Sequence, residues 1–197
     1  MKRRAIQAEQ TRAVILASAR LRFAENGYAA TSLKVIAADA GVSVQTLYDI
    51  VGSKADMVRA LNDLIDEEAA IGEVARDARS QDPAIVADIP GRITRRILER
   101  CGDIVRSCYD AARAEPELAA VAEEGSRRHR DGTNRVASRL SDLGALPPSV
   151  SPDEAARMIA ILTDPRVGFI LLDEHGLDLD GMESWMRSAL RGWLSID

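Results

Sequence analysis

The apolar residues of this chain recur at helical spacing from one end to the other, and this pattern constrains the fold most strongly. Near the N-terminus the first stripe comprises Ile15, Leu16, Ala19 and Phe23. The clearest stripe comprises Met182, Trp185, Met186, Ala189, Leu190, Trp193 and Leu194. Apolar residues three or four positions apart lie on one face of an α-helix, whereas a strand needs an alternation that no segment has. The sequence therefore predicts an all-α protein.

Capping and turn residues predict where the helices begin and end. Ser and Thr side chains accept hydrogen bonds from the free amides at a helix N-terminus, and the candidates are Thr11, Thr31, Ser43 and Ser53. Helices are predicted after each of these residues and over residues 92–113, 116–143, 153–174 and 182–194. Proline cannot donate within a helix, so Pro90 is expected to lie outside one and Pro165 to interrupt the helix over 153–174.

Composition and cysteine spacing exclude several classes of protein. The hydrophobic share of 46% and the charged share of 29% are values of a globular chain, not a disordered one. No apolar run approaches the ~20 residues of a membrane span, and the basic start does not lead into the apolar segment of a signal peptide, so no membrane partner is expected. Cys101 and Cys108 would lie about 10 Å apart on one helix, too far for a disulfide, and are interpreted as buried thiols in a reducing cytoplasm, with a redox switch as the alternative.

The charge of the chain is unevenly divided. Residues 1–60 contain nine Lys and Arg against five Asp and Glu, a net charge of +4, whereas the whole chain carries −5 and residues 61–197 therefore −9. A basic head on an acidic protein indicates that the head meets a polyanion.

The segment Ile36-Ala37-Ala38-Asp39-Ala40-Gly41-Val42-Ser43-Val44-Gln45-Thr46-Leu47-Tyr48 has the chemistry of a helix-turn-helix. Small alanines let two helices cross closely, and Gly41 suits the turn because it adopts a positive φ at little cost. Ser43 can cap the second helix and Leu47 can anchor it, which leaves the remaining side chains to face a major groove. The alternative is an ordinary corner between two helices with no role in DNA binding.

Residues 11–58 as a whole resemble the tetracycline-repressor (TetR) family of bacterial transcription regulators. The residues that carry the resemblance are Thr11, Ile15, Leu16, Ala19, Phe23, Gly27-Tyr28, Thr31-Ser32, Ile36-Ala37, Ala40-Gly41-Val42-Ser43, Thr46-Leu47-Tyr48 and Gly52-Ser53-Lys54. This resemblance covers about a quarter of the chain. The remainder is similar to the family in helical content, length and its two amphipathic C-terminal helices.

The resemblance implies a cytoplasmic homodimer that binds a palindromic double-stranded DNA operator, usually represses, and responds to a small molecule of unknown identity. Residues 1–55 would form the helix-turn-helix domain and residues 56–197 the helical ligand-binding and dimerisation domain. The DNA-binding residues implied are Thr31, Ser32, Ser43, Val44, Gln45, Thr46, Tyr48 and Lys54. Three positions depart from the family pattern: Asp49 puts a negative charge at the end of the recognition helix, Ile50 stands where an aromatic residue or His is common, and Val51 replaces the common Phe.

Candidate residues for the dimer interface and the ligand site lie in the second part of the chain. The interface candidates are Phe169, Leu172, Met182, Trp185, Met186, Leu190 and Trp193, for which packing in the chain's own core is the alternative. The ligand-site candidates are Cys108, Tyr109, His129 and Met158, for which a structural role inside the core is the alternative.

Two other functions remain as alternatives to a ligand-responsive regulator. A constitutive DNA-binding protein would share the basic head and would need no effector. A helical enzyme would need catalytic equipment, but the sequence has no nucleophile elbow, no phosphate-binding Gly-rich loop and no metal-ligand motif, and His129 and His175 are isolated. We therefore expect no enzymatic activity, no metal and no cofactor.

Overall fold

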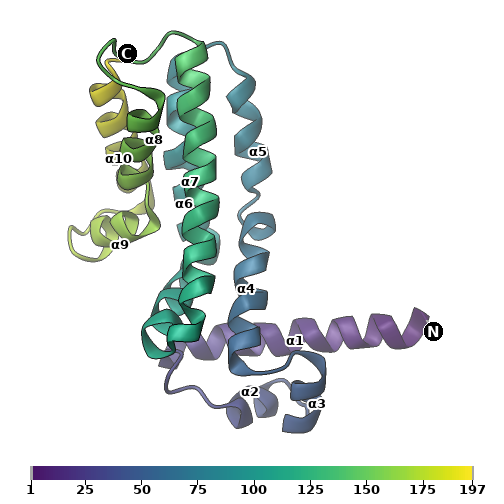
Figure 1. Ribbon diagram of the computed structural model, residues 1–197. Helices are drawn as coiled ribbons and strands as arrows, with labels where there is room; N and C mark the ends of the chain where they lie inside the picture. The colour runs from purple at the N-terminus through teal and green to yellow at the C-terminus, as the bar shows by residue number, and fades with distance from the viewer. Residues whose placement is uncertain (1, 197) are drawn as a thin grey trace. The chain divides into compact units, whose positions relative to one another are not determined.

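The computed structural model describes residues 2–196, and all of its regular elements are helices (Figure 1). The elements are α1 (Lys2–Asn26), α2 (Leu33–Asp39), α3 (Val44–Ile50), α4 (Lys54–Glu68), α5 (Ile71–Ala75), η1 (Arg76–Arg79), α6 (Pro83–Ala114), η2 (Pro116–Leu118), α7 (Ala119–Asp142), α8 (Pro152–Leu162), α9 (Pro165–Asp173) and α10 (Leu179–Leu194). The prediction of an all-α protein is confirmed. Within the described residues, no helix combines the length and the apolar character needed to span a membrane.

The chain forms two compact units. The first comprises Met1–Ile65 and Gly102–Glu124, and the second comprises Asp66–Cys101 and Gly125–Asp197. Helices α4, α6 and α7 each contribute residues to both units. The functional boundary expected at residue 55 stays a prediction.

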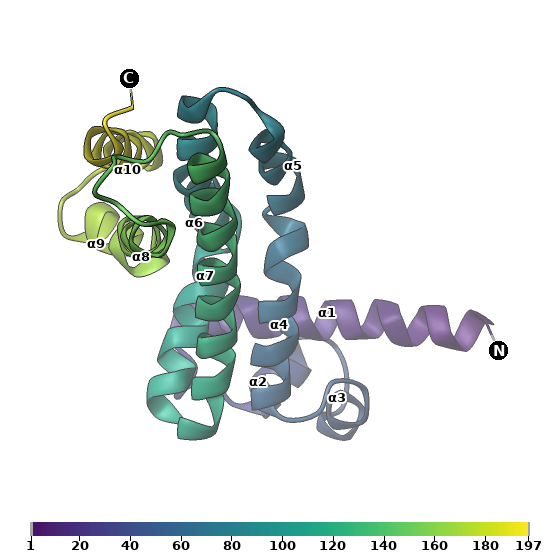
Figure 2. The ribbon, with the colours of Figure 1, turned by 45° about the horizontal axis from the view of Figure 1, so that its top comes forward.

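The core of the first unit is built on α1, which packs against α2 and α3 (Figures 1 and 2). The buried side chains of this core are Ile15, Leu16, Ala19, Phe23, Tyr28, Ile36, Ala37, Leu47, Met57, Val58 and Leu61. Two ion pairs connect α1 to other parts of the unit: Arg20 donates through its Nη2 to Asp103 over 2.8 Å, and Arg22 binds Asp39 of α2 with two nitrogens. The predicted stripe of residues 11–26 is therefore the buried face of α1.

In the second unit, α10 packs against α8 and α9. Met182 and Met186 pack with Leu98 and Leu171, while Leu190 joins the larger cluster that includes Ile159 and Leu140. Gly168 of α9 permits a close approach to α6, because a Cβ at this position would lie 2.4 Å from Leu98 Cδ1. The break predicted at Pro165 is present, since α8 ends at Leu162 and α9 begins at Pro165.

Three predictions about helix caps and breaks are wrong. Helix α1 begins at Lys2, so Thr11 lies inside it, where its hydroxyl donates to the carbonyl of Gln7 over 2.9 Å instead of capping a helix. Ser32, not Thr31, caps α2.

The third correction concerns Pro90, which lies inside α6. The missing amide and the ring disfavour proline there. Val86 and Ile89 are nevertheless buried in the same cluster against which Ile93 packs, so one apolar face continues through the proline. Packing of this face outweighs the local preference.

Candidate nucleic-acid interface

The turn between α2 and α3 has the geometry of a helix-turn-helix. Gly41 adopts a φ of 67°, and the amide of Val42 donates to the carbonyl of Ala37 over 3.0 Å. Ile36 of α2 and Leu47 of α3 are fully buried on either side of the turn. The local structure predicted for residues 36–48 is therefore present.

Ser43 caps α3, as predicted. Its Oγ accepts a hydrogen bond from the amide of Thr46 over 3.0 Å, and the two hydroxyl oxygens lie 2.8 Å apart in a second hydrogen bond. Both hydroxyls therefore help to hold the first turn of α3. Contact of Ser43 and Thr46 with DNA stays a prediction.

Four side chains of α3 are exposed, and we call them the recognition face: Val44, Gln45, Tyr48 and Asp49. The exposed fraction is 39% for Val44 and 54% for Tyr48. Val44 and Tyr48 thus place two large apolar side chains in solvent on one short helix. The Gln45 amide donates through Nε2 to Asp49 Oδ1 over 2.8 Å.

The structure places the two predicted phosphate-binding residues before α2 in different environments. Thr31 is 5% exposed, and its hydroxyl is directed at the carbonyl oxygens of Gly27, 2.8 Å away, and Arg22. Ser32 is exposed, and its Oγ accepts a hydrogen bond from the amide of Val35 over 3.4 Å. This bond does not use the hydroxyl proton of Ser32. The Thr31 side chain therefore has an internal structural role, whereas the Ser32 side chain is accessible, and a phosphate contact by either residue stays a prediction.

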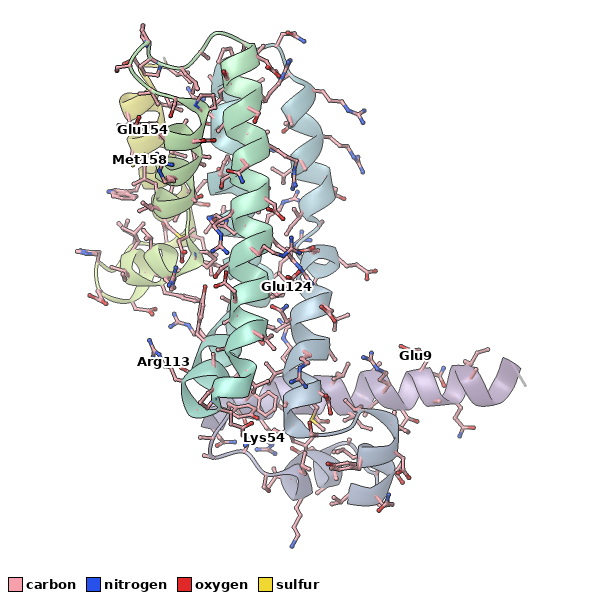
Figure 3. All side chains as sticks on the ribbon, viewed as in Figure 1. Glu9, Lys54, Arg113, Glu124, Glu154 and Met158 are labelled. Carbon is pink, nitrogen blue, oxygen red and sulfur yellow. The ribbon has the colours of Figure 1, made fainter. Side chains whose placement is uncertain are left out.

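Lys54 lies at the N-terminal end of α4 (Figure 3) and is half-buried. Its Nζ donates to the carbonyl oxygens of Tyr28 and Thr31 over 2.8 and 3.2 Å. The same Nζ lies 4.1 Å from the centroid of the Tyr28 ring. The cation therefore holds the loop between α1 and α2 to α4, and a phosphate contact by this residue stays a prediction.

Lys34 is a candidate for phosphate contact that is not among the residues implied by the family resemblance. It is exposed in the first turn of α2, two residues after Ser32. Lys34 is one of the nine basic residues of residues 1–60, and this excess of positive charge is the sequence signal that points to it. Exposed lysines bind phosphate through charge, without reading sequence.

Two carboxylates of this unit have lowered pKa values for structural reasons. Hydrogen bonds from the Arg22 guanidinium lower the pKa of Asp39. Hydrogen bonds from the side chain and the amide of Ser53 lower the pKa of Asp56, whose own amide donates to Ser53 Oγ over 3.2 Å. This reciprocal pair is a capping box at the start of α4, where Ser53 was predicted to cap.

The ligand-site candidates are divided between the two units. Cys108, which is buried, and Tyr109, which is half-buried, belong to the first unit. His129 and Met158 are half-buried in the second, where His129 Nε2 is hydrogen-bonded to the carbonyl of Ala160 over 3.0 Å; Figure 3 labels Met158 on α8. An open surface hollow of about 470 Å³ in the second unit is lined by other residues, among them Leu146, Leu194 and Ile196.

The interface candidates are likewise of two kinds. Met182, Met186 and Leu190 are at most 1% exposed, so within one chain they belong to the core, because α10 turns this stripe toward α6, α8 and α9. Trp185 is 42% exposed, and the candidates that remain are half-buried: Phe169, Leu172 and Trp193. The surface of this region also includes Ile161 of α8 and Ile170 of α9, which are 63% and 42% exposed.

Residues 15–61 match the family model described as bacterial regulatory proteins, tetR family. No curated protein matches the sequence. Several solved structures share the fold. The SmeT–triclosan complex is similar with a TM-score of 0.73 at 23% identity, over 93% of this chain and 90% of that one.

Two further solved structures have the same fold. One is NalD from Pseudomonas aeruginosa, described as the secondary repressor of the MexAB-OprM multidrug efflux pump, with a TM-score of 0.71 at 20% identity over 95% of this chain and 96% of that one. The other is the fatty acid degradation regulator FadR from Bacillus halodurans, with a TM-score of 0.73 at 17% identity over 91% and 93%. At these identities the similarity establishes the fold.

Proposed function

We propose that this protein, a DNA-binding regulator with the N-terminal domain and fold of the TetR family, acts as a homodimeric repressor in the cytoplasm. It binds a palindromic operator and is released by a small molecule. Residues 1–55 read the DNA, and residues 56–197 bind the effector and the second copy. The observation that carries the proposal is the exposed recognition face of α3, a helix that Ser43 caps and the buried Leu47 anchors.

Base reading is assigned to the recognition face. An amide can donate to and accept from the edge of one adenine, so Gln45 supplies the specific contact, and Val44 packs against a thymine methyl group. Tyr48 is exposed one turn further along the helix and contacts the adjacent base or sugar. Ser32 and Lys34 hold phosphates, while Thr31, Ser43, Thr46 and Lys54 keep these elements in position through the hydrogen bonds described above.

Dimerisation is assigned to helices α8, α9 and α10. Each of these helices exposes one large apolar side chain, Ile161, Ile170 or Trp185, which a second copy would remove from water. Tryptophan is enriched at the centres of protein interfaces. Two copies would present two recognition helices to half-sites about 34 Å apart or a multiple of that distance.

Release by a small molecule is supported by relatives of the same fold, one of which is described as a complex with triclosan and another as a repressor of an efflux pump. A ligand can release DNA only if it favours one arrangement of the two heads over another. The alternative is a constitutive DNA-binding protein, which would keep its DNA affinity in the presence of every compound tested. A panel of apolar and aromatic compounds, titrated into the protein–DNA complex, distinguishes the two functions.

Selection from a pool of random duplexes tests the DNA-binding function itself. The purified protein should enrich an inverted repeat, and two chains should bind one selected duplex. Affinity for that duplex should fall steeply with salt, because phosphate contacts release counterions. Enrichment of no sequence, or of a motif without symmetry, would overturn the proposal.

A further inference from the structure

The Gln45 and Asp49 side chains form a hydrogen-bonded pair on the recognition face. The residues are one helical turn apart, both are exposed, and Gln45 Nε2 donates to Asp49 Oδ1 over 2.8 Å. Helical side chains lean toward the N-terminus, which lets the aspartate reach back to the glutamine. We propose that Asp49 is a positioning residue that fixes the Gln45 amide so that it reads adenine and rejects guanine. This inference rests on the DNA-binding function proposed above.

The chemistry of the pair limits which hydrogen bonds Gln45 can make. An ionised carboxylate only accepts hydrogen bonds, so the amide must turn its NH2 group, and not its oxygen, toward Asp49. One N–H of Gln45 is then occupied. The amide keeps one donor and one acceptor for a base.

The major-groove edges of the two purines differ in what they require from such an amide. Adenine presents the N7 acceptor and the N6 amino donor, which match one remaining N–H and the Gln45 carbonyl. Guanine presents two acceptors, N7 and O6, and a bidentate contact with it requires two donors. A glutamine without a partner can rotate and offer both N–H groups, whereas the paired Gln45 cannot.

The negative charge of Asp49 strengthens this discrimination and lowers affinity. Its carboxylate oxygens are repelled by the acceptors of guanine and tolerate amino groups. The same charge repels the phosphates of every duplex, so it weakens binding to all sequences. Asp49 is therefore expected to reduce total affinity and increase specificity at one position of each half-site.

The test compares binding to the selected duplex with binding to duplexes in which the adenine contacted by Gln45 is replaced by guanine. Asp49→Ala should reduce the preference for adenine over guanine about tenfold and should not weaken binding to the selected duplex. Alanine is a strong helix former, so this exposed substitution should preserve α3. Glu9→Gln removes one exposed negative charge from α1 and should leave the adenine preference unchanged.

A second set of variants separates positioning by Asp49 from a simple charge effect. If Asp49 acts through Gln45, Asp49→Ala should leave base preference unchanged in a Gln45→Ala background. A uniform gain in affinity for all duplexes with no loss of adenine preference would overturn the inference. That outcome requires a selected duplex, so it is distinct from failure of the proposed function, in which no sequence is enriched.

Discussion

The Lys54 ammonium donates a hydrogen bond of 2.8 Å to the carbonyl oxygen of Tyr28 and lies 4.1 Å from the centroid of the same residue's ring. The pair closes the loop between α1 and α2 onto the start of α4. Phe23 packs beside it, with its ring centroid 5.5 Å from that of Tyr28. The half-buried Lys54 therefore stabilises the loop that leads into α2 of the helix-turn-helix.

Lys54→Ala should lower the thermal stability of the protein, because it leaves two loop carbonyls without their cationic donor. We expect the free energy of unfolding to fall by about 1.5–3 kcal/mol, the usual range for hydrogen bonds to a charged group. Thermal unfolding followed by circular dichroism measures it. Unchanged stability together with weaker binding to all duplexes would instead assign Lys54 to phosphate.

Lys34→Ala is the matched substitution on the surface. It should leave the melting temperature unchanged, because Lys34 is exposed. It should weaken binding to specific and scrambled duplexes alike and should reduce the slope of log affinity against log salt by about 1, the value for one phosphate contact. Titrations at several salt concentrations measure the slope, and an unchanged slope would exclude the contact.

Asp56→Asn should destabilise the protein at pH 7 and have a smaller effect in acid. The pKa of Asp56 is lowered in the folded state, chiefly by hydrogen bonds from Ser53. Its contribution is therefore present above the ordinary aspartate pKa of about 4 and is lost as the pH falls through the lowered value. We expect a loss near 1 kcal/mol or less at pH 7, typical of a weakened cap. Urea unfolding at pH 7 and pH 3 checks it, and an equal loss at both values would contradict it.

Two adjacent residues of α10 should respond differently to substitution. Trp185→Asp should convert the proposed dimer to a monomer without unfolding the chain, because in that dimer the exposed indole faces a second copy. Met186→Ala should instead lower stability by about 2–5 kcal/mol, because Met186 is fully buried in the chain's own core. Light scattering and thermal unfolding measure the two effects. Leu21→Asp, an equally drastic change at an exposed site of α1, is the control and should leave the dimer intact.

Neither cysteine should react with a thiol reagent at pH 8 while the protein is folded. Cys101 and Cys108 are buried, and burial raises the pKa of Cys108 to about 12, so almost no thiolate forms. Ser188→Cys adds an exposed thiol on α10 as a positive control. Rapid labelling of the native thiols would favour the redox switch that the sequence left open.

Local chemistry explains what could be predicted from the sequence. The cap of α3 by Ser43 and the turn at Gly41 depend on neighbours within a few residues, and both are present. Lys54 contacts residues at least 23 positions away in the sequence, and Thr31 contacts the folded α1–α2 loop. A sequence motif does not show these contacts, so it could not distinguish a structural role from DNA contact.

In the long helices α6 and α10, too, contacts between residues far apart in the sequence could not be predicted from local patterns. Pro90 was expected to lie outside a helix, but Val86, Ile89 and Ile93 belong to or pack against one buried cluster, and tertiary packing continues α6 through the proline. On α10, the apolar stripe predicted a buried face but could not say whether the chain itself or a second copy covers it. Only the exposure of Trp185 beside the buried Met186 separates the two surfaces.

The most direct test of the central claim is the ratio of the Kd for a scrambled duplex to the Kd for the selected duplex. It is measured at one salt concentration for the natural protein and for a Gln45→Ala/Tyr48→Ala variant. Specific binding typically exceeds non-specific binding by at least 10³-fold, and we predict a ratio of that order for the natural protein. In the variant the ratio should fall steeply, with only the contact of Val44 left to read a base, while affinity for the scrambled duplex stays unchanged because its phosphate contacts persist. A ratio near 1 for the natural protein, or an undiminished ratio for the variant, would contradict the assignment of base reading to α3.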